Sequence, residues 1–297
     1  MSPGSLLHRA LRAALRKLET VDFAPSGHFY SPVVDRAEAA ASQARLWPAQ
    51  PRLPAGIDFN DASHRQLLEV EFPRYIAGFD YAMKDGVSAK GGYSPDNPQF
   101  GWLDAKVLFV MLQAWRPARI IEVGSGHSSL LMADVNRRFL GGRMHITCIE
   151  PYPETFLKSA DCGIDRLVQA KVQDVPLEEF DSLAAGDVLF IDSSHVSKAG
   201  SDVNYLFFEV LPRLASGVRI HIHDVFLPFE YPRSWLLEQG RSWNEQYLLQ
   251  ALLMDNPLFE IVFGSSYCAW KYPELMHHTI VGTEATAGGG SFWIEKR

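Results

Sequence analysis

The sequence predicts an α/β fold built on a doubly wound, mostly parallel sheet of seven strands with an antiparallel C-terminal hairpin. Two observations favour it. From residue 119 onward, short apolar runs alternate with helical segments, which is typical of a parallel sheet covered on both faces. The runs themselves, such as D-V-L-F-I-D at 187–192, are almost continuously apolar, as expected of strands buried on both faces.

The elements expected in the first hundred residues are mainly helical. Residues 5–19 combine leucines at helical spacing with arginines, which indicates an amphipathic basic helix that docks on the body or on a partner subunit. Residues 20–60 are rich in proline and alanine and predict an irregular arm. We expect helices over 61–84 and 102–115. The loop at 86–99, around Lys90–Tyr93, is a candidate lid over a ligand.

We therefore predict a helical and irregular N-terminal extension over 1–99 and one catalytic domain over 100–297. Within that domain, the patterns predict strands at 119–124, 144–150, 166–172, 187–192 and 218–225, with helices at 127–139, 153–160, 176–184 and 201–214. Two further strand candidates, 258–264 and 290–296, end the chain. No clear helical pattern separates them, so we expect them to form the antiparallel hairpin at the sheet edge.

Composition excludes several classes of protein. The 297 residues are 47% hydrophobic and carry a net charge of −7, which gives no electrostatic reason to expect a nucleic-acid partner. No apolar stretch approaches the roughly 20 residues that cross a bilayer. The cysteines, Cys148, Cys162 and Cys268, form no CxxC pair and suit a reducing compartment. We expect a cytoplasmic protein with no membrane span.

Polar residues close the predicted strands. In parallel α/β sheets, ligands bind beyond the carboxyl ends of the strands, so these residues are the first candidates for a site. They are Glu122, Gly124, Glu150, Asp174, Asp192, His223 and Asp224.

The first of these strand ends reads R-I-I-E-V-G-S-G-H-S-S-L at 119–130. Gly124 and Gly126 permit a tight turn and a close approach of the backbone to a ligand. A dinucleotide site needs a third glycine, but Ser129 stands at that position. Glu122 would repel a pyrophosphate and attract an ammonium group instead. The stretch therefore favours S-adenosylmethionine over NAD.

Two acids further along could contact the rest of such a cofactor. Glu150 ends the second strand, where a carboxylate can accept hydrogen bonds from ribose hydroxyls; it could equally cap the next helix. Asp174 lies where an acid could accept a bond from the exocyclic amine of adenine, or it could be a turn residue.

Five motifs in this order, I-I-E-V-G-S-G-H-S-S, C-I-E-P, Q-D, L-F-I-D-S-S-H and H-I-H-D-V-F-L-P, resemble the class I S-adenosylmethionine-dependent methyltransferases. More narrowly, they resemble a bacterial small-molecule branch with the I-D-S-S-H motif. The resemblance covers about residues 100–297 and implies a Rossmann-like fold with an antiparallel edge. It places the methionine end of the cofactor over Gly124–Gly126, the ribose on Glu150 and the adenine near Gln173 and Asp174. The predicted cofactor contacts are Glu122, Gly124, Ser125, Gly126, Ser128, Glu150, Gln173, Asp174 and Asp192.

The chemistry is expected at the ends of the fourth and fifth strands. These strands should be neighbours, so Asp192, His195, His223 and Asp224 could converge beside the transferred methyl group. An imidazole titrates near neutral pH, so we predict His195, with Asp192 and His223, as the catalytic group that removes a proton from a hydroxyl acceptor. Alternatively, His195 only caps its loop. We interpret His221 as a hydrogen-bonded core histidine.

Asp192 and Asp224 are also candidate ligands for a divalent metal ion such as magnesium or manganese. The resemblance implies this, because some relatives bind such an ion with acids at these two strand ends. Oxygen ligands suit Mg, Ca or Mn, whereas added imidazoles shift the preference toward Fe, Ni or Zn. This chain has His223-Asp224 where metal-dependent relatives show Asp-Asn.

We predict an enzyme that methylates a small-molecule acceptor, on a hydroxyl oxygen, with a homo-oligomer through the N-terminal helix as a further possibility. Aromatic side chains after the fifth strand could line the acceptor pocket, and Arg233 or Arg241 could pair with an acidic group. The alternatives are an NAD-linked oxidoreductase or epimerase and a non-catalytic cofactor-binding subunit. The aromatic candidates are Phe226, Phe229, Tyr231, Trp235 and Trp243.

Overall fold

The computed structural model describes residues 23–81, 92–95, 97, 99–281 and 289–297. Contacts divide the chain into two compact units, Met1–Ala49 with Pro232–Ser242 and Gln50–Tyr231 with Trp243–Arg297. The predicted helix over 5–19 and most of the candidate lid lie outside the described residues. The boundary predicted at residue 99 stays a prediction.

Within its described residues, the smaller unit contains three short helices, α2 (Arg36–Ala41), α3 (Gln43–Leu46) and α10 (Arg233–Leu237). The Asp35 side chain caps α2 by accepting hydrogen bonds from the backbone N–H groups of Ala37 and Glu38.

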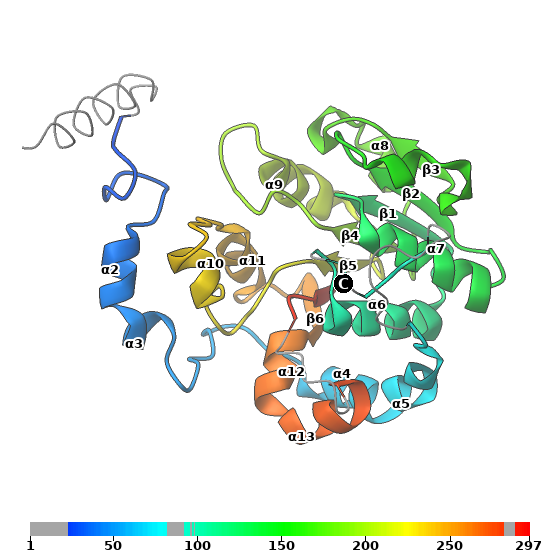
Figure 1. Ribbon diagram of the computed structural model, residues 1–297, viewed down its shortest axis with the longest axis horizontal. Helices are drawn as coiled ribbons and strands as arrows, with labels where there is room; N and C mark the ends of the chain where they lie inside the picture. Colours follow the sequence, from blue (N-terminus) through cyan, green and yellow to red (C-terminus); the bar gives the residue numbers. More distant parts are fainter. Residues whose placement is uncertain (1–22, 82–91, 96, 98, 282–288) are drawn as a thin grey trace, which may run out of the picture. The chain divides into compact units, whose positions relative to one another are not determined.

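The larger unit is built on a seven-stranded sheet of order β3-β2-β1-β4-β5-β7-β6 (Figure 1). The first five strands pair in parallel, and β7 is antiparallel to both of its neighbours. The fold class predicted from the sequence, including the antiparallel C-terminal edge, is confirmed. The strands are β1 (Arg119–Val123), β2 (His145–Ile149), β3 (Arg166–Val168), β4 (Val188–Ile191), β5 (Arg219–Ile222), β6 (Phe259–Gly264) and β7 (Phe292–Lys296).

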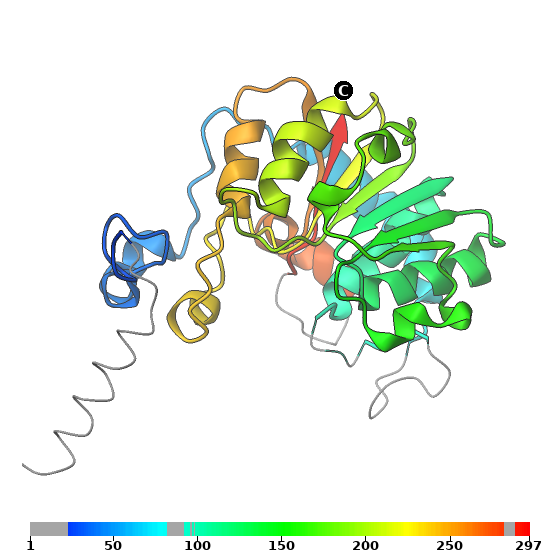
Figure 2. The ribbon, with the colours of Figure 1, turned by 90° about the horizontal axis from the view of Figure 1, so that it is seen from above.

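Helices cover both faces of this sheet, as the view from above shows (Figure 2). The α-helices are α4 (Asp61–Gln66), α5 (Phe72–Tyr75), α6 (Trp102–Trp115), α7 (His127–Phe139), α8 (Glu178–Asp181), α9 (Asp202–Tyr205), α11 (Glu245–Leu253), α12 (Ser265–Lys271) and α13 (Pro273–Met276). Shorter 3-10 and π turns are η1 (Leu67–Glu71), η2 (Ile76–Gly78), η3 (Thr155–Lys158), η4 (Ala160–Cys162), η5 (Val172–Asp174), η6 (Leu206–Val210), η7 (Leu211–Arg213) and η8 (His277–Val281).

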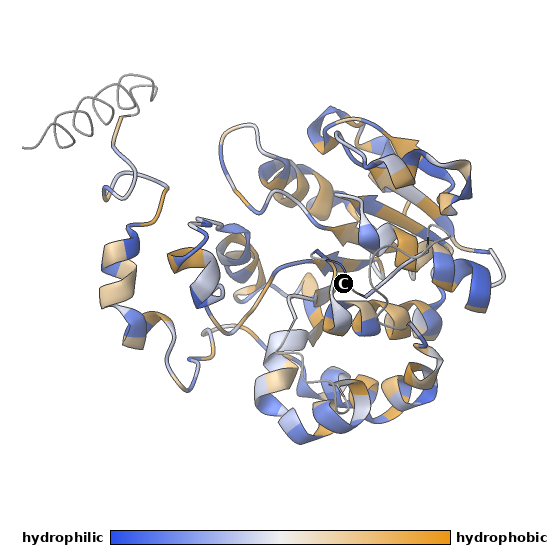
Figure 3. Cartoon of the chain, in the orientation of Figure 1, coloured by the Kyte–Doolittle hydropathy of each residue, from blue (hydrophilic) through white to orange (hydrophobic). Residues whose placement is uncertain are grey.

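The sheet separates two hydrophobic cores. Successive residues of a strand point to opposite faces, so Ile120 joins the core under α6 and α7, and Ile121 joins the core under α9 and α11. Colouring by hydropathy shows mainly apolar strands and helices that mix apolar with polar residues (Figure 3). Burial on both faces explains why the strands read as continuous apolar runs.

Three local expectations differ from the structure. The arm predicted as irregular over 20–60 contains the short helices α2 and α3. The segment 153–160, predicted as a helix, forms only the short turns η3 and η4. The expectation of no helix between the last two strands is wrong, because α12, α13 and η8 fill that connection. Tyr267, Cys268 and Met276 from these helices are buried in the cores, and this burial supplies the stabilisation that propensity alone did not predict.

In the described part of the chain, no helix is long and apolar enough to cross a membrane.

Candidate active site

The turn after β1 depends on Gly124 for a steric reason. Gly124 has φ +79°, and a Cβ atom there would lie 1.8 Å from the carbonyl oxygen of Asp192. The turn therefore rests directly on the end of β4. Gly126 differs, because the nearest atom to a Cβ built there is Gln99 Oε1 at 3.8 Å. Its missing side chain leaves open space at the start of α7.

Glu122 lies beneath this turn, with none of its surface exposed. Its carboxylate accepts hydrogen bonds from the Ser128 hydroxyl at 2.5 Å, from the Ser129 hydroxyl and from the Cys148 thiol at 3.3 Å. Burial raises the pKa of Glu122 to about 7, although these hydrogen bonds oppose the shift. Glu122 thus fastens α7 to the sheet, and its direct contact with a ligand stays a prediction.

A cavity of about 550 Å³ opens beyond the carboxyl ends of β1, β2 and β4. Four of the predicted cofactor residues line it: Gly124, Glu150, Gln173 and Asp192. The remaining lining residues are Val123, Ile149, Pro151, Tyr152, Lys171, Val172, Ser193, Ser194, Lys198, Gly200, Ser201 and Asp202.

Within this cavity, Glu150 is held by the backbone. Its carboxylate accepts hydrogen bonds from the N–H groups of Ser125 at 3.2 Å and Tyr152 at 2.8 Å. The Gln173 side chain donates to the carbonyl of Gly200 at 3.0 Å. Both side chains are therefore fixed in position before a ligand arrives.

The other predicted cofactor residues, Glu122, Ser125, Gly126, Ser128 and Asp174, are not among the residues that line the cavity. Asp174 is exposed at the end of η5. The Ser125 hydroxyl is buried and makes no hydrogen bond to the described residues. Contacts between these residues and a cofactor stay predictions.

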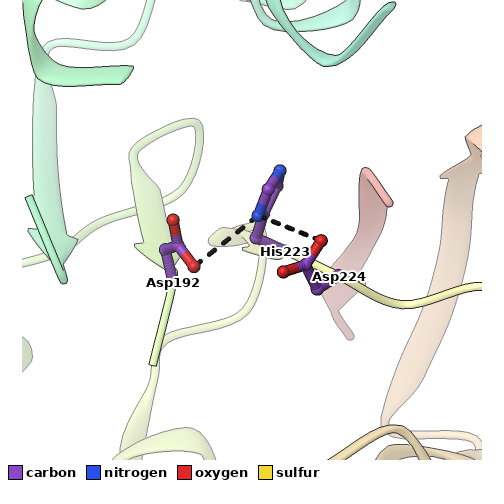
Figure 4. A group of neighbouring side chains, drawn as sticks. All are labelled: Asp192, His223 and Asp224. Carbon is purple, nitrogen blue, oxygen red and sulfur yellow. Dashed lines mark ion pairs between the residues drawn. The ribbon is translucent and has the colours of Figure 1, made fainter. Parts of the chain in front are cut away.

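The predicted chemical residues do converge. Asp192 follows β4 directly, His223 and Asp224 follow β5, and the two strands are paired neighbours. His223 Nδ1 lies 3.6 Å from Asp192 Oδ1 and 3.6 Å from Asp224 Oδ1 (Figure 4). One ligand atom from each of these three side chains lies within 4.8 Å of the other two, so the group could hold a metal ion.

His195 borders the same two aspartates from another side. Its Nε2 atom lies 3.3 Å from Asp192 Oδ1 and 3.6 Å from Asp224 Oδ2. Its Nδ1 atom lies 2.8 Å from the buried carboxylate of Glu245, and its ring packs on Trp243. Glu245 therefore fixes the ring so that Nε2 faces the aspartates.

The backbone is also unusual here. His195 and Asp224 both adopt positive φ, +59° and +57°, which is uncommon outside glycine. Strain of this kind clusters at functional sites, where the surrounding structure holds it in place.

The charges of the cluster shift one another's protonation. Burial raises the pKa of Asp224, and it would also raise that of Asp192, but His223 and His195 bring the pKa of Asp192 far below its usual range. For His195, burial acts to lower the pKa, but Asp192 and Glu245 raise it to about 10. A ring that already holds its proton cannot accept another, so the base role predicted for His195 needs a positive charge nearby.

His221 behaves as a core histidine. Its ring stacks on Phe190, its Nε2 atom lies 3.2 Å from the Ser291 hydroxyl, and burial holds its pKa well below the usual value. Its Nδ1 atom has no hydrogen-bond partner in the described chain, so the predicted hydrogen bonding holds for one nitrogen only.

Two carboxylates of the cluster were missed by the sequence analysis. Glu245 is 1% exposed at the start of α11, and Asp104 lies in the first turn of α6, with Oδ2 3.6 Å from His223 Nε2. Both residues lie within 100–297, which resembles the family, but neither follows a strand, so their positions along the chain offered no reason to select them.

The aromatic segment after β5 is divided between the two units. Phe226 and Tyr231 are buried in the larger unit, where Trp243 packs on His195. Trp235 belongs to the smaller unit and stacks with Arg241 there. The predicted lining of an acceptor pocket stays a prediction.

Comparisons with known proteins agree with this arrangement. Residues 121–225 match the family model described as "Methyltransferase domain". The chain is 35% identical over 165 residues to an uncharacterized protein of Archaeoglobus fulgidus, and the match covers 54% of this chain and 73% of that protein. Among solved structures, it is similar to the O-methyltransferase from Bacillus cereus in complex with SAH, at 15% identity and a TM-score of 0.38, over 88% of this chain and 97% of that one.

The family match spans the strands, the turn and the cluster described above, from β1 to the residue after Asp224. Together with the order of motifs in the sequence and the observed strand order, it establishes the identity of the larger unit. The chain belongs to the class I S-adenosylmethionine-dependent methyltransferases.

Proposed function

We propose that the protein methylates an oxygen atom of a small-molecule acceptor at the carboxyl edge of its sheet. One observation carries this proposal: Asp192 lines the cavity and also belongs to the His–Asp cluster. A cofactor in the cavity would therefore place its reactive end beside the groups that handle a proton. Methyl transfer requires this juxtaposition, because donor and acceptor must be aligned in line.

The residues present fit the cofactor. Glu150 would hold the ribose hydroxyls, and Gln173 with Asp174 would border the adenine. When bound, S-adenosylmethionine supplies the methyl group on a positively charged sulfur. The open space at Gly126 leaves room for the methionine end above α7.

The acceptor hydroxyl would lie against the cluster, near His195 and Asp192. Here the chain must accept the hydroxyl proton. His195 is the candidate acceptor when a divalent ion on Asp192 and Asp224 supplies the positive charge that its base role needs. A bound ion supplies Lewis-acid chemistry, which lowers the pKa of a coordinated hydroxyl. The buried His223, without a hydrogen bond from either nitrogen to the described residues, indicates that the cluster is incomplete without such a partner.

Calorimetry on the full chain tests the cofactor assignment. We expect S-adenosylhomocysteine to bind and NADH not to bind. Incubation with deuterated-methyl S-adenosylmethionine and a panel of phenols, catechols and sugar alcohols, read by mass spectrometry, tests the acceptor class. Methyl transfer only to amines, or none with any class of acceptor, would overturn the proposed oxygen chemistry.

A further inference from the structure

We propose that His223 is itself a ligand of the ion, so that the centre has one imidazole and two carboxylate ligands and prefers a transition metal to magnesium. This inference rests on the proposed function, in which the ion was assigned to Asp192 and Asp224 alone. It adds a ligand and a metal preference to that site.

The burial of His223 indicates a missing partner. The residue is 4% exposed, yet neither ring nitrogen makes a hydrogen bond to any described group. Buried polar atoms without partners are rare in folded proteins, and each such atom requires an explanation. Nδ1 points between two carboxylates (Figure 4), where an ion would give it a partner.

The spacing of the three side chains suits a common ion. Nδ1 of His223 lies 3.6 Å from one oxygen of Asp192 and 3.6 Å from one oxygen of Asp224. Ligand atoms that sit 2.0–2.2 Å from one tetrahedral ion are separated by about 3.3–3.6 Å. The observed separations are longer than ordinary hydrogen bonds and match those of ligands around a common ion.

A carboxylate lies behind the His223 ring, on the side away from the two ligand aspartates. Nε2 of His223 faces Asp104 Oδ2 at 3.6 Å, and Asp104 is anchored by the backbone N–H of Ser291 at 2.9 Å. A metal-binding histidine almost always directs its second nitrogen to such a carboxylate, which orients the ring and increases its basicity. α6 thus supplies an outer residue, Asp104, for the ligand His223, which follows β5.

His195 has a different place. It faces the oxygens of the same aspartates but is not part of the compact group of three ligands, and Glu245 fixes its ring. The two histidines therefore have different roles. His223 binds the ion, and His195 lies beside the acceptor. An imidazole in the ligand set favours Fe, Co, Ni or Zn over Mg and Ca.

The test is metal binding by the metal-free full chain. We expect Co²⁺ and Zn²⁺ to bind at least about 100-fold more tightly than Mg²⁺ by calorimetry. His223→Ala should weaken Co²⁺ binding by about 10-fold or more and change the visible Co²⁺ spectrum, and Asp104→Asn should weaken it by about 10-fold. His223→Asp should move the preference toward Mg²⁺. His145→Ala, at the exposed opposite end of β2, is the matched control and should bind like wild type.

Pulsed EPR of the Mn²⁺-loaded wild-type chain gives a readout that needs no variant. Labelling with ¹⁵N-histidine should change the nitrogen coupling of the bound ion. Absence of nitrogen coupling, equal affinity for Mg²⁺ and Co²⁺, or unchanged Co²⁺ binding by His223→Ala would overturn the inference. Binding of S-adenosylhomocysteine is measured on the same samples, so a failure of the cofactor assignment is seen separately.

Discussion

Two regions at the same edge of the sheet differ in whether their buried polar groups have hydrogen-bond partners. Under the turn after β1, Glu122 is fully buried, and two hydroxyl groups and a thiol donate hydrogen bonds to its carboxylate. At the ends of β4 and β5, His223 is nearly as buried and makes no hydrogen bond to the described residues. Burial alone therefore does not separate scaffold from site. The two differ in whether the buried group already has its partners.

The largest expected effect concerns the turn. Gly124→Ala would place a Cβ against the Asp192 carbonyl at positive φ, so we expect a loss of about 4 kcal/mol or more in the free energy of unfolding. Urea unfolding measures it. Gly126→Ala is the control, because its Cβ meets no atom closer than 3.8 Å, and it should change stability by less than about 1 kcal/mol. Equal losses in the two variants would contradict the steric account.

The next effect concerns the pH dependence contributed by Glu122. Its pKa is raised from 4.5 to about 7, so the folded state binds more protons than the unfolded state in that window. The free energy of unfolding therefore falls by about 3 kcal/mol as pH rises from 4.5 to 7, because the folded state resists losing this proton. Glu122→Gln removes this loss. Unfolding curves of both proteins at pH 5 and pH 8 measure the difference, and parallel pH profiles would show that Glu122 is ionised throughout.

A smaller effect is expected on the affinity for the cofactor. Glu150→Gln should weaken S-adenosylhomocysteine binding by about 10- to 100-fold, because charged hydrogen bonds to ribose contribute about 1.5–3 kcal/mol. Calorimetry measures the change. The exposed neighbour Glu154 supplies the control, since Glu154→Gln should bind like wild type. Wild-type affinity in Glu150→Gln would remove Glu150 from the cofactor site.

The smallest effect is expected at Asp174, which is exposed and does not line the cavity. Asp174→Asn should weaken the binding of S-adenosylhomocysteine by about two- to fivefold, which is the contribution of one ordinary hydrogen bond. S-inosylhomocysteine lacks the exocyclic amine, so Asp174→Asn and the wild-type protein should bind it with equal affinity. A loss of the same size for both compounds would show that Asp174 does not contact adenine.

The parts of the site that depend on strand order could be predicted from the sequence. β-strands buried on both faces are recognisable from their composition, and the neighbouring ends of β4 and β5 bring Asp192, His223 and Asp224 together as expected. Glu245 and Asp104 could not be predicted in the same way. Each lies in the first turn of a helix, Glu245 in α11 and Asp104 in α6, and only the packing of those helices on the sheet brings their side chains to the histidines.

The role of Glu122 was also beyond sequence reasoning. A carboxylate before a glycine turn can face a ligand or face inward, and its direction depends on whether hydroxyls at the start of the next helix satisfy it. Ser128 and Ser129 do so here. The helical connection over α12 and α13 was missed because its buried residues contribute to both cores at once.

The contact between Gly124 and the Asp192 carbonyl has a consequence for selectivity. Main-chain atoms, which cannot change rotamer, fix how far the loop after β1 stands from the end of β4. Under the proposed function, the backbone of this fold then fixes the distance between the methyl donor and its recipient. Discrimination among recipients of different size must come from more adaptable parts of the chain that border the cluster from outside the sheet.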